Sequence, residues 1–242
     1  MDEKRFYPDA MNYLVKRAQA MTRLKVLSLE TRPEYLKKRL LEEMVRKTNA
    51  DIVDTTVGFE TQDDRIRNAI LGKNMQRSLL EEKIRLLGRL GVRLTSYVML
   101  KPGPLMTEEE GIREALATVD YLQAHCQRAH TALVIYLSPT YIARGSPLAG
   151  VMRRVGYRPP KIQSVLKTII EITRRGIAVY TGLWCENLAE DKGDFSGRDD
   201  YDPRIRNVVK EFNKTQDFSL VEPYKENIEE TVRDDARSKA SH

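Results

Sequence analysis

Segments typical of strands alternate with segments typical of amphipathic helices along this chain, and the alternation limits its possible folds. Strands are expected at residues 23–30, 51–59, 92–100, 132–137 and 177–183. Helices are expected after Pro33, over residues 79–90, after Thr107 and over residues 162–170. Strands joined by helical crossovers run parallel, so the sequence predicts an α/β fold: a barrel, part of a barrel, or an open doubly wound sheet.

Residues that start and stop helices support these boundaries. Pro33 stands where a helix can begin, because its missing N–H is not needed there. Gly91 is expected to end the second helix, and Thr107 with Glu110 forms a capping box for the third. Prolines and glycines predict a long loop over residues 138–161.

The predicted organisation is one α/β domain with a C-terminal extension over residues 1–222, followed by a charged tail over 223–242. With 41% hydrophobic and 31% charged residues the composition is that of a soluble globular protein, and its apolar runs are too short to cross a membrane. The chain opens on charged residues instead of an apolar leader, so a cytoplasmic location is expected. The net charge of +6 favours RNA or DNA as a partner, although a solvated basic surface explains it equally well.

Candidate functional residues are sought at the carboxyl ends of the strands, where ligands of parallel α/β proteins bind. Glu30 and Arg32 lie at the end of the first strand, where a guanidinium can hold a carboxylate or phosphate. The alternative is a surface ion pair. Lys101 ends the third strand, where it can meet a ligand carboxylate or be a solvated lysine at a turn.

The second strand ends in Gly58, Glu60 and Thr61. Gly58 allows close backbone approach, and the Glu60 carboxylate can accept hydrogen bonds from ribose hydroxyls or an ammonium group. The alternative is that Thr61 or Asp63 caps the next helix.

The last two strands end in residues with aromatic, hydroxyl and thiol groups. Tyr136 and Ser138 end the fourth strand, where they can line an adenine or another base. Trp184 and Cys185 follow the fifth strand and can touch a substrate, although a lone tryptophan is more often a packing residue.

Several common kinds of site are not indicated by the sequence. It contains no G-x-x-x-x-G-K-[ST], no G-x-G-x-x-G and no G-x-S-x-G. Cys126 with His125 and His130 makes no recognised metal-ligand set, and a lone helical cysteine is usually a core residue. No metal site is therefore expected in this chain, and two cysteines do not make a disulfide framework.

Three segments in this order resemble the radical S-adenosylmethionine (radical SAM) superfamily: VLSLETRPEYL, DIVDTTVGFETQDDRIRNAILGKN and GVRLTSYVMLKPGPLMTEEEGI. The resemblance is to the elongator-type enzymes that modify RNA, and within them to the radical enzyme of archaeosine biosynthesis, which works on tRNA. The segments IAVYTGLWCENL and VVKEFNKTQDF resemble the end of that family's domain, so the resemblance covers most of residues 1–222.

The resemblance implies a partial (β/α)₆ barrel that binds S-adenosylmethionine and a [4Fe–4S] cluster at its strand tips and forms a 5′-deoxyadenosyl radical. It also implies a place along the cofactor for each candidate residue: Glu30 and Arg32 at the methionine part, Gly58, Glu60 and Thr61 near the ribose, Lys101 at the next strand tip, and Tyr136 and Ser138 at the adenine.

The chain departs from this family at the cluster. Family members ligate it through three cysteines spaced C-x-x-x-C-x-x-C, whereas this sequence holds only Cys126 and Cys185, and neither lies in such a loop. The family's glycine-rich second-strand motif is absent as well. Both belong upstream of Met1, so the first two barrel strands are expected to be missing.

Four interpretations follow. The chain is the downstream piece of a split enzyme completed by a separate polypeptide that carries the cluster loop, or the product of an incomplete or decayed gene. It is otherwise a cluster-free descendant that binds RNA or a nucleotide, or an ordinary α/β protein that shares only the fold. We expect a radical SAM-type partial barrel from a tRNA-modifying family that lacks its own cluster loop, needs a separate cluster-bearing segment and cannot perform the radical reaction alone. The alternative is a cluster-free RNA- or nucleotide-binding module.

Overall fold

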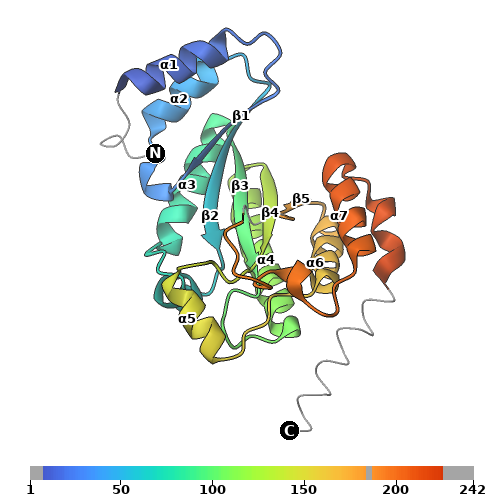
Figure 1. Ribbon diagram of the computed structural model, residues 1–242. Coiled ribbons are helices and arrows are strands. Elements are labelled where there is room, and N and C mark those ends of the chain that lie inside the picture. Colours follow the sequence, from blue (N-terminus) through green and yellow to red (C-terminus); the bar gives the residue numbers. More distant parts are fainter. Residues whose placement is uncertain (1–7, 184–186, 226–242) are drawn as a thin grey trace. The chain divides into compact units, whose positions relative to one another are not determined.

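The computed structural model describes residues 8–183 and 187–225, which contain a parallel five-stranded sheet (Figure 1). Its strands are β1 (Val26–Thr31), β2 (Ile52–Glu60), β3 (Arg93–Leu100), β4 (Leu133–Pro139) and β5 (Ala178–Thr181). Their order in the sheet is their order in the chain. A doubly wound sheet reverses its order at a switch point, and this sheet does not, so its winding is that of a barrel segment. The α/β prediction is confirmed.

At least one helix follows every strand. The α-helices of the described residues are α1 (Pro8–Gln19), α2 (Lys38–Lys47), α3 (Arg77–Leu90), α4 (Glu108–Arg128), α5 (Pro147–Arg154), α6 (Ile162–Arg174) and α7 (Pro203–Thr215). Shorter turns are η1 (Pro33–Tyr35), η2 (Arg65–Ile70), η3 (Phe195–Gly197), η4 (Phe218–Leu220) and η5 (Glu222–Tyr224). Among these turns η2 is a π-helix, which hydrogen-bonds from residue i to residue i+5.

The predicted helix signals at Gly91 and Thr107 are confirmed. Gly91 ends α3 with a φ of 65°, in the left-handed region that favours glycine. The Thr107 N–H donates to the Glu110 carboxylate at 2.8 Å, and the Glu110 N–H donates to Thr107 Oγ1 at 3.2 Å. This reciprocal pair is the capping box that the sequence indicates.

Two other predicted elements are corrected by the structure. Pro33 begins only the short turn η1, because Leu36 and Lys37 are extended, and α2 starts at Lys38. Residues 138–161 are not all loop, since they contain α5. Pro147 occupies the first turn of α5, and the Ser146 side chain accepts a hydrogen bond from the Ala149 N–H, so local capping stabilises this short helix.

The chain divides into two compact units. Unit 1 comprises Met1–Phe59, Met75–Tyr97 and Tyr121–Val134; unit 2 comprises Glu60–Asn74, Val98–Asp120 and Ile135–His242. The amino-terminal parts of β2, β3 and β4 therefore belong to unit 1, whereas their carboxyl ends belong to unit 2.

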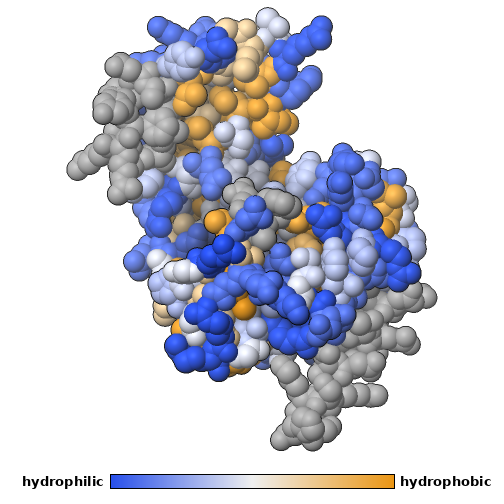
Figure 2. All heavy atoms as spheres, viewed as in Figure 1, coloured by the Kyte–Doolittle hydropathy of each residue, from blue (hydrophilic) through white to orange (hydrophobic). Residues whose placement is uncertain are grey.

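Unit 1 carries an exposed apolar patch. Its members come from α1, the segment after it, α2 and the first residues of β1 and β2: Tyr13, Leu14, Met21, Val26, Val45 and Ile52. Figure 2 shows hydrophobic side chains gathered over this end of unit 1. Large exposed apolar patches often mark interaction sites in soluble proteins.

Between residues 8 and 183 and between 187 and 225, no helix is both long and apolar enough to span a bilayer.

Candidate functional site

In unit 1, polar side chains of β1, β2 and β3 meet around the carboxylate of Asp54. Ser28 Oγ donates to Asp54 Oδ2 at 2.6 Å, while Arg93 Nε and Thr95 Oγ1 donate to Asp54 Oδ1 at 2.7 and 2.8 Å. Asp54 is 1% exposed, so its charge is buried but fully paired. This cluster was not predicted from the sequence, where its one signal is a lone acid inside a strand rich in valine and threonine.

Glu30 and Gly58 lie further along the same strands. In the β1–β2 register Ser28 is opposite Asp54 and Glu30 is opposite Thr56. Side chains two residues apart share a face of a strand, so Glu30 and Gly58 lie on the face of the Asp54 cluster, nearer the carboxyl ends. Glu30 is exposed, and its Oε2 accepts one long hydrogen bond of 3.4 Å from the Tyr97 hydroxyl. Its carboxylate keeps most of its capacity to accept hydrogen bonds.

Arg32 is engaged by a neighbour in the chain. Its Nη2 donates to Glu34 Oε1 at 2.7 Å, and its Nε lies 3.3 Å from the same oxygen. This hydrogen bonding raises the pKa of Arg32 above its usual value. Arg32 therefore forms an ion pair within the chain, the alternative to ligand binding, and its partner is Glu34.

In unit 2, Glu60 and Thr61 also have internal partners. Lys73 Nζ donates to Glu60 Oε1 at 2.7 Å, and the Thr61 hydroxyl donates to Glu114. The predicted alternative of a helix cap is confirmed at Asp63, whose Oδ1 accepts from the Ile66 N–H at 2.9 Å at the start of η2.

Lys101 is buried at the end of β3, so the alternative of a solvated lysine is wrong. Its Nζ donates to Glu108 Oε1 at 2.9 Å and to the Arg158 carbonyl at 2.8 Å. The Tyr157 hydroxyl donates to the Lys101 carbonyl at 2.8 Å, and the Lys101 ammonium lies 5.1 Å from the centre of the Tyr157 ring. The ammonium thus has its carboxylate partner within unit 2.

Tyr136 and Ser138 line a cavity of about 100 Å³ in unit 2. Gly182 and Phe195 are among its other walls. A Cβ on Gly182 would lie 3.3 Å from the Tyr136 ring, so this glycine makes room for the tyrosine. Ligand sites usually measure about 300–1,000 Å³, so this cavity is too small for a whole nucleoside. Trp184 and Cys185 lie outside the described residues.

The eight predicted site residues thus separate into two groups. Glu30 and Gly58 in unit 1 and Tyr136 and Ser138 in unit 2 line a strand face or a cavity near strand ends. Arg32, Glu60, Thr61 and Lys101 are held by partners within the chain. The roles of all eight in binding a cofactor stay predictions.

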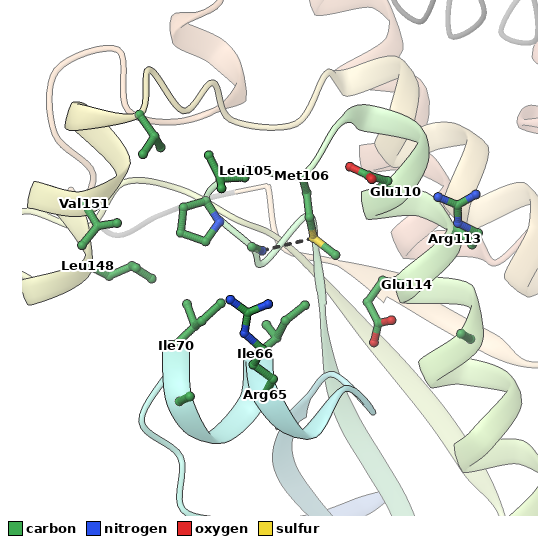
Figure 3. Close-up of a pocket in the computed structure, with 15 residues that line it drawn as sticks. Arg65, Ile66, Ile70, Leu105, Met106, Glu110, Arg113, Glu114, Leu148 and Val151 are labelled. Carbon is green, nitrogen blue, oxygen red and sulfur yellow. Dashed lines mark hydrogen bonds between the residues drawn. The ribbon is translucent and has the colours of Figure 1, made fainter.

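Unit 2 also holds a larger cavity that was not predicted from the sequence. It measures about 770 Å³, and its walls come from η2, residues 103–106, α4 and α5 (Figure 3). No sequence motif points to it, because its walls are adjacent only in the folded chain.

No protein family's sequence profile matches the chain. An uncharacterized protein of Methanocaldococcus jannaschii is 23% identical over 91% of this chain. The archaeosine synthase subunit beta of Thermococcus kodakarensis is 20% identical over 93% of it, and that of Methanosarcina acetivorans is 24% identical over 76%. The chain spans 59%, 67% and 50% of the lengths of these three relatives.

Among solved structures, Elp3 of Methanocaldococcus infernus with residues 1–46 deleted aligns with a TM-score of 0.56 at 14% identity. The alignment covers 85% of this chain and 45% of Elp3. The resemblance to elongator-type and archaeosine-type radical SAM proteins is confirmed. The shared fold explains the barrel-type winding of the sheet.

Proposed function

We propose that this chain forms the S-adenosylmethionine-binding part of a tRNA-modifying radical enzyme of the archaeosine type, with its iron–sulfur cluster supplied by another polypeptide. The observation that carries the proposal is the likeness to archaeosine synthase subunit beta over 93% and 76% of the chain. A tRNA substrate agrees with the net charge of +6.

The cysteines of this chain do not fit a [4Fe–4S] cluster. The sequence holds two, fewer than the three thiolates of the family motif. Cys126 is buried, and burial raises the pKa of its thiol to about 12, so it resists forming the thiolate that iron requires. In the described part of the chain no three histidine, cysteine or acidic side chains converge on a metal position. We therefore derive no step through the cluster from these residues.

The strand-end residues do fit parts of S-adenosylmethionine. The exposed Glu30 carboxylate can accept hydrogen bonds from an ammonium group or from hydroxyls, and Gly58 lets the ligand approach the backbone of β2. The roles of Tyr136 and Ser138, which belong to unit 2, stay predictions of the resemblance. When bound beside a reduced cluster, the cofactor would supply the radical that removes a hydrogen atom from the substrate.

The apolar patch on unit 1 supports the proposal that a separate polypeptide binds this chain. Exposing a large apolar surface to water is unfavourable in free energy unless a partner covers it. In addition, the name "subunit beta" of two relatives describes a component of an assembly. We propose that the partner that carries the cluster covers this patch.

Calorimetric titration of the full chain with S-adenosylmethionine tests the proposal. We expect one site per chain and an affinity about tenfold weaker in Glu30→Gln, because a hydrogen bond to a charged group is lost. Glu109→Gln is the matched control, since Glu109 is an exposed carboxylate on α4 in unit 2. The absence of saturable binding, or equal weakening in both variants, would contradict the proposed site.

Anaerobic reconstitution with iron and sulfide tests whether the cluster is bound by another polypeptide and not by this chain. We expect substoichiometric iron on the chain alone, because two thiols cannot hold the cluster. Stoichiometric iron and sulfide would overturn this part of the proposal.

A cluster-free RNA- or nucleotide-binding module is the second candidate function, and the cysteine count favours it. It predicts tRNA binding without any affinity for S-adenosylmethionine.

A further inference from the structure

The 770 Å³ cavity of unit 2 is lined mainly by apolar side chains (Figure 3). Ile66 and Ile70 of η2, Leu105 and Met106 of the loop after β3, and Leu148 and Val151 of α5 form most of its walls. Its volume lies within the range of about 300–1,000 Å³ that is usual for small-molecule sites. The predicted cofactor residues do not line it, so its ligand is independent of the proposed function.

One wall of the cavity is the π-helix η2. The Leu71 N–H donates to the Ile66 carbonyl at 2.9 Å, the i to i+5 bond of that winding. Arg65, Ala69 and Ile70 therefore turn to the same side and all line the cavity. Short π-helical segments are rare and occur frequently at functional sites.

The wall is held rigidly in place. Arg67 is 0% exposed, and its Nη1 donates to the Thr61 and Gln62 carbonyls at 2.9 and 3.2 Å. Asp63 caps the start of η2 as described above. These contacts fix η2 within unit 2, and a wall that is already ordered lowers the entropy cost of binding.

The cavity also holds four charged side chains, two acids and two arginines. Its two acids are occupied: Glu110 accepts from the Thr107 N–H in the capping box, and Glu114 accepts from the Thr61 hydroxyl and the Gln62 amide. The side chains of Arg65 and Arg113 form no hydrogen bond or ion pair with any described residue. Arg65 points into the cavity from η2 (Figure 3). A guanidinium binds carboxylates and phosphates through paired hydrogen bonds.

We propose that this cavity binds a small anionic amphiphile, a molecule with an apolar body and a carboxylate or phosphate head that pairs with Arg65. The apolar walls accept the body, and the unpaired guanidinium selects the head. An RNA strand fits less well, because none of the described residues that line the cavity is aromatic and bases would have no ring to stack on.

Calorimetric titration of the full chain with three probes tests this proposal: dodecanoate, dodecyl phosphate and the uncharged methyl dodecanoate, all below micelle-forming concentrations. We expect one site per chain for both anions and at least tenfold weaker binding of the ester. The ratio between the two anions distinguishes a carboxylate head from a phosphate head.

Three variants localise the binding. Arg65→Gln is expected to weaken dodecanoate binding about tenfold and leave ester binding unchanged, whereas Arg89→Gln, an exposed arginine on α3, is the matched control. Ala117→Trp is expected to abolish binding of all three probes by filling the cavity. Leu105 is 78% exposed, so the fold is expected to tolerate a substitution there. Leu105→Glu is expected to weaken the binding of both anions at least tenfold, because its carboxylate repels their charged heads.

Four outcomes would overturn the proposal: no saturable binding of either anion, equal affinity for the ester, equal weakening by Arg89→Gln, or unchanged affinity in Leu105→Glu. Loss of tRNA binding in Arg65→Gln without any dodecanoate affinity would also overturn it, in favour of an RNA surface.

Discussion

Glu108 is the residue at which three separate segments of unit 2 meet. Its carboxylate accepts hydrogen bonds from Lys101 Nζ at 2.9 Å, the Lys161 N–H at 3.1 Å and Ser164 Oγ at 2.6 Å. Arg198 Nη1 lies 3.8 Å from Glu108 Oε1. A buried charge is tolerated only when it is paired in this way, so removing the carboxylate leaves a buried ammonium without its counterion.

Glu108→Gln is therefore expected to lower the free energy of unfolding by about 3–5 kcal/mol. Urea denaturation followed by circular dichroism measures it. In the control Glu42→Gln, loss of the exposed ion pair with Lys38 is expected to cost only about 0.3–0.5 kcal/mol. Equal effects of the two substitutions would contradict the importance of the buried network.

Asp200 gives unit 2 a pH-dependent contribution to stability. Arg198 donates to both carboxylate oxygens at 2.6 and 2.7 Å, which lowers the pKa of Asp200 from 3.8 to about 2. Because the pKa is lower in the folded state, the ionised carboxylate stabilises the fold above about pH 4, and this contribution disappears as the pH falls toward 2.

The difference in unfolding free energy between the wild type and Asp200→Asn should accordingly shrink as the pH falls from about 4 to about 2. Urea titrations at a series of pH values measure this difference. A constant difference over that interval would show that Asp200 is not stabilised by its ionised form.

Glycines in two helices illustrate how the same substitution has opposite effects in different elements. Gly91 ends α3 with a φ of 65°, whereas Gly150 lies inside α5, where only the flexible Arg154 side chain comes within 3.5 Å of an added Cβ. A side chain at the first position is strained, but at the second it restricts the unfolded chain and favours the helix.

Gly91→Ala is expected to destabilise the protein by about 1 kcal/mol, and Gly150→Ala to stabilise it by about 0.5–1 kcal/mol. Thermal unfolding of the two variants beside the wild type provides the measurement. Two shifts of the same sign would contradict this assignment of the backbone at one of the positions.

At the scale of elements, periodicity and capping residues predicted the strands and α3, α4 and α6, because the burial of one apolar face dictates their pattern. α5 was missed since it has only 8 residues and lies among prolines and glycines, which locally indicate loop. The π-helical winding of η2 was not predicted, because no residue pattern in its six residues distinguishes it from an α-helix.

For the whole molecule, the net charge of +6 and the proposed tRNA substrate make affinity depend on salt. If the complex neutralises about six phosphates, raising the salt from about 50 to about 200 mM should weaken binding roughly a thousandfold. Fluorescence anisotropy with labelled tRNA measures this slope, and an affinity independent of salt would contradict an interface dominated by phosphate contacts.

The sequence by itself determined the α/β class, the order of the strands along the chain and the resemblance to archaeosine-type radical SAM proteins, because periodicity and ordered motifs are local properties. Only the tertiary structure decided which strand-end residues remain available to bind a ligand. It left the Glu30 carboxylate exposed but gave Lys101 a buried partner, Glu108, from the next helix. The cavity beside η2 was also decided by the folded chain, since its walls come from residues 65–70, 103–117 and 148–155. Pairing and enclosure depend on distances in space, which spacing along a sequence does not encode.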